Sequence, residues 1–559
     1  MTDLVSLSAR SVSAAVGDAT GGWILPTLVA VPLAGALLLL LVPRLGDRVA
    51  TVFGGVVATV AAVLAVLVAI GAAPYHDVRT SLEVNHSWVP ALGIRFHLGV
   101  DGISVPLVLL TALLGLLVSW HLVRVVPPGG RTRALAACVL AVEGGALATF
   151  VTLDLLLFFV AFEIVLIPMW FVVALWGDDT QKPRRIGRSA PLPGGEEARR
   201  DAAFRFILYT AFGSALMLLG IVLVGLKAHT TDLVLLAHGA GAALPTWVQT
   251  AAAFLIVIGL AVKTPMWPFH TWLPPAHSIA PTPGSVLLAG VLLKMGTYGM
   301  VRIALPVLPQ GMHTVAPWLG AFAVVGILWG GLACLVEQDL KRLVAFSSVA
   351  HMGFVLLGIA SATSIGVQGA LFANVAHGLI TGLLFLVAGA VKDRHHTADL
   401  VSLGSGLRDR LPRLGWLLAF GAFAGLGLPG LAGFWGELLA IAGTWQGHAA
   451  LGWLAKPLAV AAVIGTVLAS AYLLRVLRMV WHGPREPRWL GEGIRDAAPF
   501  EMAVATPLVL ATVALGVVPA LVLDMTGPAV RTMLTASTAA PAAAGATQHG
   551  TAQDAGGQP

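Results

Sequence analysis

The apolar runs of this chain constrain its fold most, because about fourteen of them are long enough to cross a lipid bilayer. Of all residues 57% are hydrophobic and 11% are charged, whereas soluble chains carry about 25% charged residues. We therefore predict an all-α polytopic membrane protein with about fourteen transmembrane helices. The predicted helices begin near Trp23, Val49, Val100, Ala134, Leu153, Phe204, Trp247, Gly284, Thr314, Leu340, Ile365, Leu414, Pro457 and Phe500.

The basic residues predict the orientation of these helices. If the helices alternate in direction, 24 of the 33 Lys and Arg residues lie in loops on one side, with Lys341 and Arg342 counted among them, and 7 lie on the other. The positive-inside rule then places the 177–205 loop in the cytoplasm and both termini outside a bacterial plasma membrane. The N-terminal segment has no basic stretch followed by an apolar one, so we expect no cleavable signal.

Seven ionisable residues interrupt the apolar runs, each in a different predicted helix. An ionisable group in hydrocarbon costs about 2.5–3.5 kcal/mol, so each one calls for an explanation. One such residue alone can be a paired or snorkelling side chain, and a lone histidine can belong to the core. A set spread over seven helices is typical of a proton relay. The set consists of Glu143, Glu163, Lys263, Lys294, His351, His377 and Glu437.

Two of these residues lie beside predicted helix breaks. Pro265 and Pro268 follow Lys263, and Pro429 with neighbouring glycines precedes Glu437. Proline removes a backbone donor and clashes with the preceding turn, so each helix should be interrupted there. Broken helices at corresponding places in two halves are typical of internally repeated transporters. The alternative is a kink that serves packing alone.

The chain shows no sequence sign of redox chemistry of its own. Cys138 and Cys334 lie far apart in apolar runs and form no metal-binding spacing. There is no nucleotide-binding fingerprint either. We therefore expect no cofactor or metal in this chain.

Four motifs carry a family resemblance. KTPMWPFHTWLPPAHSIAPTPGSVLLAGVLLKMGTYG (263–299), EQDLKRLVAFSSVAHMG, HGLITGLLFLVAG and GLPGLAGFWGE resemble the antiporter-like membrane subunits of respiratory complex I. This family is also related to the subunits of Mrp-type cation/proton antiporters. The resemblance covers about residues 100–481 and assigns proton-pathway roles to the seven ionisable residues by motif match.

The resemblance also implies a domain organisation. Residues 1–133 would form helices 1–3, residues 134–302 a first inverted five-helix repeat, and residues 314–481 a second. Residues 482–535 would hold the last transmembrane helix, and the composition of 536–559 predicts disorder. Glu437 stands where the family usually has lysine, which is similar to the M-type branch. We also expect no long lateral helix after the last span.

These expectations imply a proton-translocating subunit of a proton-pumping NADH:quinone oxidoreductase, an enzyme whose redox chemistry takes place in other chains. FMN, iron–sulfur clusters, NADH and quinone would bind partner subunits, and L-type and N-type antiporter-like subunits and small membrane subunits would be neighbours. The alternative is a sodium/proton antiporter subunit of the Mrp type, which has no redox partner.

Overall fold

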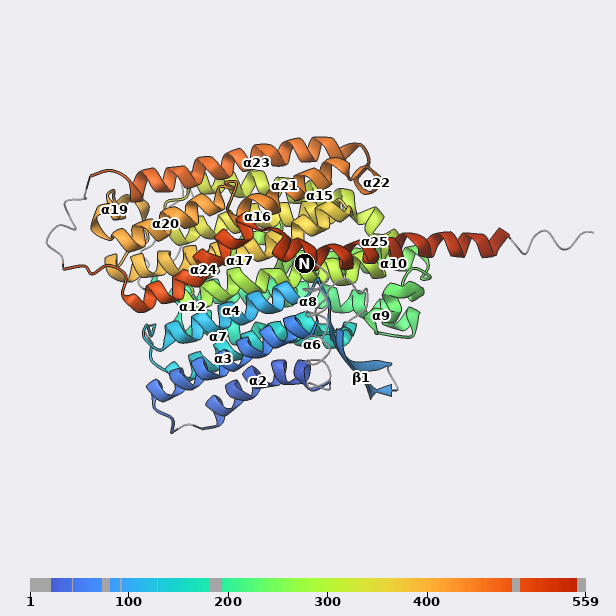
Figure 1. Ribbon diagram of the computed structural model, residues 1–559, viewed down its shortest axis with the longest axis horizontal. Helices are drawn as coiled ribbons and strands as arrows, with labels where there is room; N and C mark the ends of the chain where they lie inside the picture. Colours follow the sequence, from blue (N-terminus) through green and yellow to red (C-terminus); the bar gives the residue numbers. More distant parts are fainter. Residues whose placement is uncertain are drawn as a thin grey trace, which may run out of the picture.

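The computed structural model describes residues 22–42, 44–72, 81–90, 93–127, 129–179, 194–484 and 493–549, with side chains up to residue 535. Long helices run side by side along one axis (Figure 1). Within the described part, 13 helices are long and apolar enough to cross a membrane. They are α2 (Ile24–Leu41), α3 (Asp47–Gly71), α4 (Val105–Leu122), α5 (Thr132–Val151), α6–α7 (Leu155–Trp176), α8 (Gly195–Ala228), α10 (Thr246–Lys263), α12–α14 (Thr282–Val307), α15 (Pro309–Val336), α16 (Leu340–Ala360), α17 (Ser364–His395), a run that contains α23 (His448–Trp481), and α24 (Pro499–Val517).

The twelfth of the fourteen predicted helices is present in two pieces. The run near Leu414 forms α20 (Pro412–Gly425) and α21 (Ala432–Gln446), each too short to span a bilayer alone. Between them Gly427 and Gly430 have φ values of 72° and 91°, a left-handed backbone that glycine adopts without strain. The predicted break before Glu437 is therefore confirmed.

The other predicted break follows α10, which ends at Lys263. A short 3₁₀ turn (Phe269–Trp272) and α11 (Leu273–Ile279) continue the crossing. Non-helical backbone within a membrane must have its polar groups satisfied by protein. Trp272 contributes to this, because its indole N–H donates to the Val262 carbonyl at 2.9 Å.

The polar segment before α4 forms a hairpin of two antiparallel strands, β1 (Ser81–Val89) and β2 (Ile94–Val100). The buried ring of His97 fastens β2, with Nδ1 2.8 Å from Asp232 Oδ2 and Nε2 2.7 Å from Glu83 Oε1. Burial lowers the pKa of His97, but the hydrogen bonds and charges of Asp232 and Glu83 outweigh it. The pKa of His97 therefore lies above its usual value. Below that pKa the charged ring stabilises the contacts that join β2 to Glu83 and Asp232.

The loops that carry most of the basic residues lie at one end of the bundle. The α2–α3 connection and α19 (Leu407–Arg410) are at the left in Figure 1, and the hairpin, α9 (Leu233–Leu235) and α22 (His448–Leu451) are at the right. At the basic end Arg394 pairs with Glu501 at 2.7 Å, and Arg475 donates to the Glu337 carbonyl at 2.9 Å. Residues 180–193 of the predicted 177–205 loop lie outside the described residues.

A matching pair of local motifs supports the predicted inverted repeats. In each half a long helix ends on a histidine with left-handed backbone, and an aspartate shortly after it caps a short helix. That aspartate forms a bridge to the aspartate that caps an earlier helix of the same half. These residues are His229, Asp232 and Asp154 in the first half, and His396, Asp399 and Asp339 in the second. The first motif adjoins α9 and the second precedes α19, at opposite ends of the bundle (Figure 1). The repeats as whole units remain a prediction.

The last helix, α25 (Ala520–His549), continues into the segment for which the composition predicts disorder. Residues 550–559 of that segment lie outside the described residues.

We expect the basic end of the bundle to face the cytoplasm. Glu197, at the start of α8, and Ser87, in β1, are exposed residues at the two ends. In a chain whose free Cys138 and Cys334 are replaced by alanine, Glu197→Cys should react with a membrane-impermeant maleimide only after the cells are opened. Ser87→Cys, the matched control, should react in intact cells. Reaction of position 197 in intact cells would reverse the orientation.

Candidate functional site

Lys294 lies at the centre of the bundle on a helix with π-type turns. The helix runs through α12 (Thr282–Leu287), a π turn (Leu288–Leu292) and α13 (Leu293–Gly299). A π turn frees a backbone carbonyl from its usual helical partner. The fully buried Lys294 ammonium donates to the Ala289 carbonyl in this turn, and it lies 2.7 Å from Nδ1 of His377.

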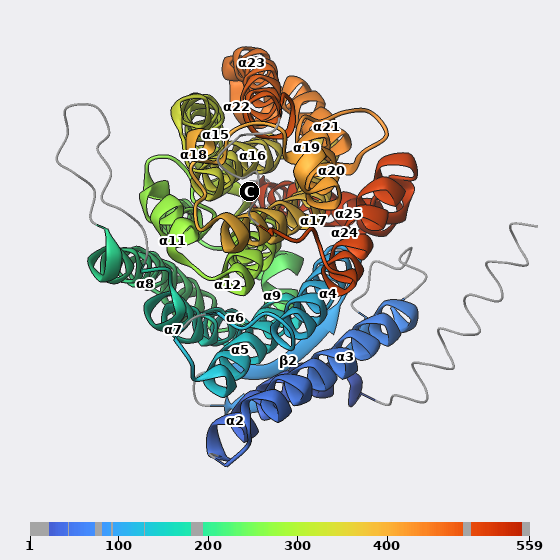
Figure 2. The ribbon, with the colours of Figure 1, turned by 90° about the vertical axis from the view of Figure 1, so that its left-hand side faces the viewer.

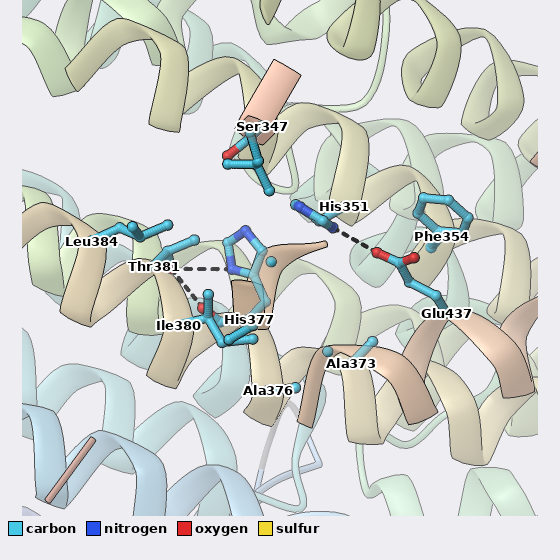
Figure 3. A pocket seen from close by; sticks show the side chains of 14 residues that line it. Ser347, His351, Phe354, Ala373, Ala376, His377, Ile380, Thr381, Leu384 and Glu437 are labelled. Atoms are coloured by element: carbon cyan, nitrogen blue, oxygen red, sulfur yellow. Dashed lines mark hydrogen bonds and ion pairs between the residues drawn. The ribbon is translucent and has the colours of Figure 1, made fainter. Parts of the chain in front are cut away.

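His377 and His351 connect Lys294 to the glutamate of the second broken helix. His377 is on α17, which lies inside the bundle (Figure 2), and His351 is on α16. Their ring centroids are 5.9 Å apart, at an interplanar angle of 64°. His351 Nδ1 is 3.0 Å from Oε1 of Glu437 on α21, as Figure 3 shows. Four of the seven predicted residues therefore form one line of contacts across four helices.

A small cavity lies between the two histidines and Glu437. Its walls include the hydroxyls of Ser347 and Thr381, together with apolar side chains. The volume that the centre of a water molecule can occupy in this cavity is about 30 Å³. About 10–15 Å³ suffices for one water molecule. Nε2 of His377 is buried and has no hydrogen-bond partner in the part of the chain that the structure describes. Water in the cavity can therefore bridge the gap between the two rings.

Lys263 and Glu163 form a second, looser group. Lys263 has 2% of its surface exposed, and its ammonium lies 4.5 Å from the centroid of the Phe162 ring, which places it in cation–π contact. Glu163, the next residue on α6 (Leu155–Ile164), acts on Lys263 electrostatically. Lys263 Nζ and Glu163 Oε1 are both buried and have no hydrogen-bond partner among the described residues. Among the described residues the two side chains thus form no direct ion pair.

Glu143 stands apart from both groups. It is fully buried on α5, and neither carboxylate oxygen has a hydrogen-bond partner among the described residues. It packs against Gly115 of α4 so closely that a Cβ on Gly115 would lie 2.4 Å from the Glu143 carboxyl carbon. The structure therefore does not bring Glu143 into the line from Lys294 to Glu437.

Three buried polar residues near this line were missed by sequence reasoning. His277 on α11 is fully buried and stacks on Phe385 with centroids 4.5 Å apart, and its place in the HTWLPPAH motif was a usable signal. The predicted position of Lys341 in a basic loop is wrong. Lys341 is 3% exposed at the start of α16, where its ammonium donates to the Ala280 carbonyl at 2.7 Å. Tyr472 on α23 (Ala455–Val476) has an apolar sequence context that carries no such signal.

The arrangement is suited to passing protons. An amine, two imidazoles and a carboxylate follow one another along it, and each can bind and release a proton. Among the residues that the structure describes, no three His, Cys, Asp or Glu side chains gather where they could hold a metal ion.

The chain is similar to known membrane proteins along most of its length. Residues 192–465 match the family model described as "NADH:quinone oxidoreductase/Mrp antiporter, TM". NADH-quinone oxidoreductase subunit M of Rhodobacter capsulatus is 38% identical over 91% of this chain and 95% of its own length. A chain of respiratory complex I from Thermus thermophilus has a TM-score of 0.78 at 27% identity, covering 92% of this chain and 99% of that one. A chain of the Mrp complex from Dietzia sp. DQ12-45-1b has a TM-score of 0.77 at 23% identity, over 93% and 99%, which shows the fold alone.

The fold, the two broken helices and the buried ionisable groups are those of an antiporter-like membrane subunit. Within that class, the chain belongs to the family of NADH-quinone oxidoreductase subunit M.

We expect ordered water between Glu163 and Lys263, because buried polar atoms without any partner are rare. An experimental structure that resolves water should show density bridging Glu163 Oε1 and Lys263 Nζ. It should also show water in the cavity between His377 and His351, which serves as the internal comparison. A dry gap at the first place, in a map that shows water at the second, would contradict the expected bridge.

Proposed function

We propose that this chain is a proton-translocating membrane-arm subunit, of the M type, in a proton-pumping NADH:quinone oxidoreductase. The observation that carries the proposal is the line of buried contacts from Lys294 through His377 and His351 to Glu437. A bundle that needed these groups for packing alone would be served as well by apolar residues, because buried charges are weak evidence for stability.

The geometry suggests the order of proton transfer. Lys294 and His377 are in hydrogen-bond contact, so a proton can pass directly from the ammonium to Nδ1. Transfer from His377 to His351 requires a water molecule in the cavity that separates them. His351 then protonates Glu437, whose carboxylate is its direct partner. Glu437 would be the terminal site on this line.

Lys263 and Glu163 would control the supply of protons. A buried ammonium favours the neutral form unless an opposite charge is near. Lys263 has Phe162 as its close neighbour and Glu163 as its counter-charge at longer range. A change that alters the Glu163–Lys263 interaction would therefore load or release the Lys263 proton, which would pass toward Lys294. Glu143, which stands apart from both groups, would belong to the pathway by the motif match alone.

The energy for these steps would come from partner subunits. The described residues include neither a metal-binding cluster nor a disulfide, and both cysteines are free. Flavin, iron–sulfur clusters, NADH and quinone would bind other chains of the complex. Neighbouring L-type and N-type subunits would transmit the redox change to this chain, in a bacterial plasma membrane with both termini outside.

A sodium/proton antiporter subunit of the Mrp type is the second candidate, because the family model that matches residues 192–465 covers both kinds of protein. The two functions differ in their partners. An assembly purified through this chain should show flavin and iron–sulfur absorbance if it belongs to the oxidoreductase. A pure antiporter would show neither.

We expect Glu437→Gln to leave the complex assembled but to reduce proton pumping and coupled quinone reduction strongly. Glutamine keeps the shape and hydrogen bonding of the side chain but cannot carry the transferred proton. Glu437→Asp, which keeps a carboxylate on a shorter arm, should retain part of the activity. Proton uptake into reconstituted vesicles, measured with NADH oxidation, tests both variants. Normal pumping by an assembled Glu437→Gln complex would leave this residue a structural role.

A further inference from the structure

The hydroxyl of Tyr472 contacts the proton line at the ring of His351. Tyr472 is fully buried on α23, a helix that lies outside the line from Lys294 to Glu437. Its oxygen is 3.3 Å from Nε2 of His351, whose other ring nitrogen faces Glu437. Thr466 of the same helix contacts Glu437 itself, with its hydroxyl 3.4 Å from Oε2. Helix α23 therefore touches both members of the His351–Glu437 pair.

The two nitrogens of a neutral imidazole must play opposite roles, one as donor and one as acceptor. When Glu437 is ionised it can only accept, so Nδ1 of His351 carries the proton and Nε2 of the neutral ring is an acceptor. When Glu437 is protonated it donates to Nδ1, so Nε2 carries a hydrogen and needs an acceptor. The second state holds one proton more than the first, and that proton enters at Nε2. The partner of Nε2 must therefore change from donor to acceptor when the His351–Glu437 pair gains a proton, and it stays an acceptor while a proton passes from Nδ1 to Glu437.

A hydroxyl is suited to this reversal, because it has one donor and two acceptor positions and can rotate. Phenylalanine would fill the same volume without a polar group that has to be buried, and burying a hydroxyl without a partner is unfavourable. The buried tyrosine hydroxyl has His351 and Ser347 as hydrogen-bond partners, which a phenylalanine would not need.

We infer that Tyr472 is a positioning residue that holds the His351 ring in place and pairs with Nε2 both before and after the His351–Glu437 pair takes up a proton. The inference rests on the proposed function, since it concerns the last step of the proton line. It adds a fifth helix, α23, to the proton line, and it explains why His351 can be both a donor and an acceptor toward Glu437 without losing a buried hydrogen bond.

The charged and titratable groups that face His351 come from three helices. They are Glu437 on α21, His377 on α17 and Tyr472 on α23. The variant that tests the inference is Tyr472→Phe, which removes the hydroxyl and leaves the ring. A matched control is Tyr298→Phe, because Tyr298 is equally buried and its hydroxyl donates to the backbone carbonyl of Phe150 at 3.0 Å.

The whole complex is reconstituted in vesicles, and proton uptake and NADH oxidation are measured across a range of pH. Loss of one buried hydrogen bond in the transfer step should lower both rates by about three- to tenfold in Tyr472→Phe. A hydrogen bond from a charged ring is stronger than one to a neutral ring, so loss of the hydroxyl disfavours the protonated ring more and should move the alkaline limb of the pH profile to lower pH. Tyr298→Phe should keep the wild-type profile. A packing defect would lower the rates equally at every pH.

A double variant separates this inference from the proposed function. If Tyr472 acts through His351 and Glu437, then Tyr472→Phe should cause no further loss in a Glu437→Gln complex. Wild-type rates and pH profile in Tyr472→Phe, with Glu437→Gln impaired, would overturn the role of Tyr472 and leave the proposed function standing. Normal pumping in both single variants would overturn the proposed function as well.

If the Tyr472→Phe complex assembles poorly, the role of Tyr472 can be tested with Tyr472→Gln. Tyr472→Gln restores a group that donates and accepts, and rates are then compared per flavin in the assembled complex. Recovery of the wild-type pH profile in Tyr472→Gln supports the inference, and a profile no better than that of Tyr472→Phe overturns it.

Discussion

Burial of ionisable groups in an apolar bundle is the constraint on which the rest of this structure depends. In hydrocarbon a charged side chain costs about 2.5–3.5 kcal/mol or more, and the cost falls when a partner is in contact. Lys294, His377, His351 and Glu437 meet this constraint by pairing with one another or with backbone carbonyls. The same pairing that makes these groups tolerable also places each within reach of the next.

The helix irregularities supply the remaining partners. The π turn before Lys294 presents the Ala289 carbonyl to the ammonium, and the end of α10 places Lys263 at the negative pole of a helix dipole. At the second break, the left-handed backbone of Gly427 lets the chain pass close to Glu437, since a Cβ there would lie 3.2 Å from the carboxylate. Regular helices in these places would leave the buried groups with fewer polar contacts from the protein.

The sequence predicted the helices and the buried ionisable residues from Lys294 to Glu437, because apolar runs and isolated charges are strong local signals. It could not show which charges meet. The contact between Lys294 and His377 joins residues 83 positions apart, and Glu143, which had the same sequence signal, turned out to stand alone. Lys341 looked like a loop residue because it follows Asp339 and precedes Arg342, yet the fold buries it. Tyr472 had no sequence signal, because one tyrosine in an apolar helix is ordinary.

The two aspartate bridges each connect helices within one half of the chain. Asp154 is tied to Asp232 and Asp339 to Asp399, so each bridge closes within one half of the chain and at one end of the bundle. Each half is thus braced against internal distortion at its own rim, while the two halves meet in the interior through contacts such as Lys294 with His377 and Thr297 with Asn374. A movement of one half relative to the other would therefore change the 2.7 Å contact between Lys294 and His377, which belong to different halves.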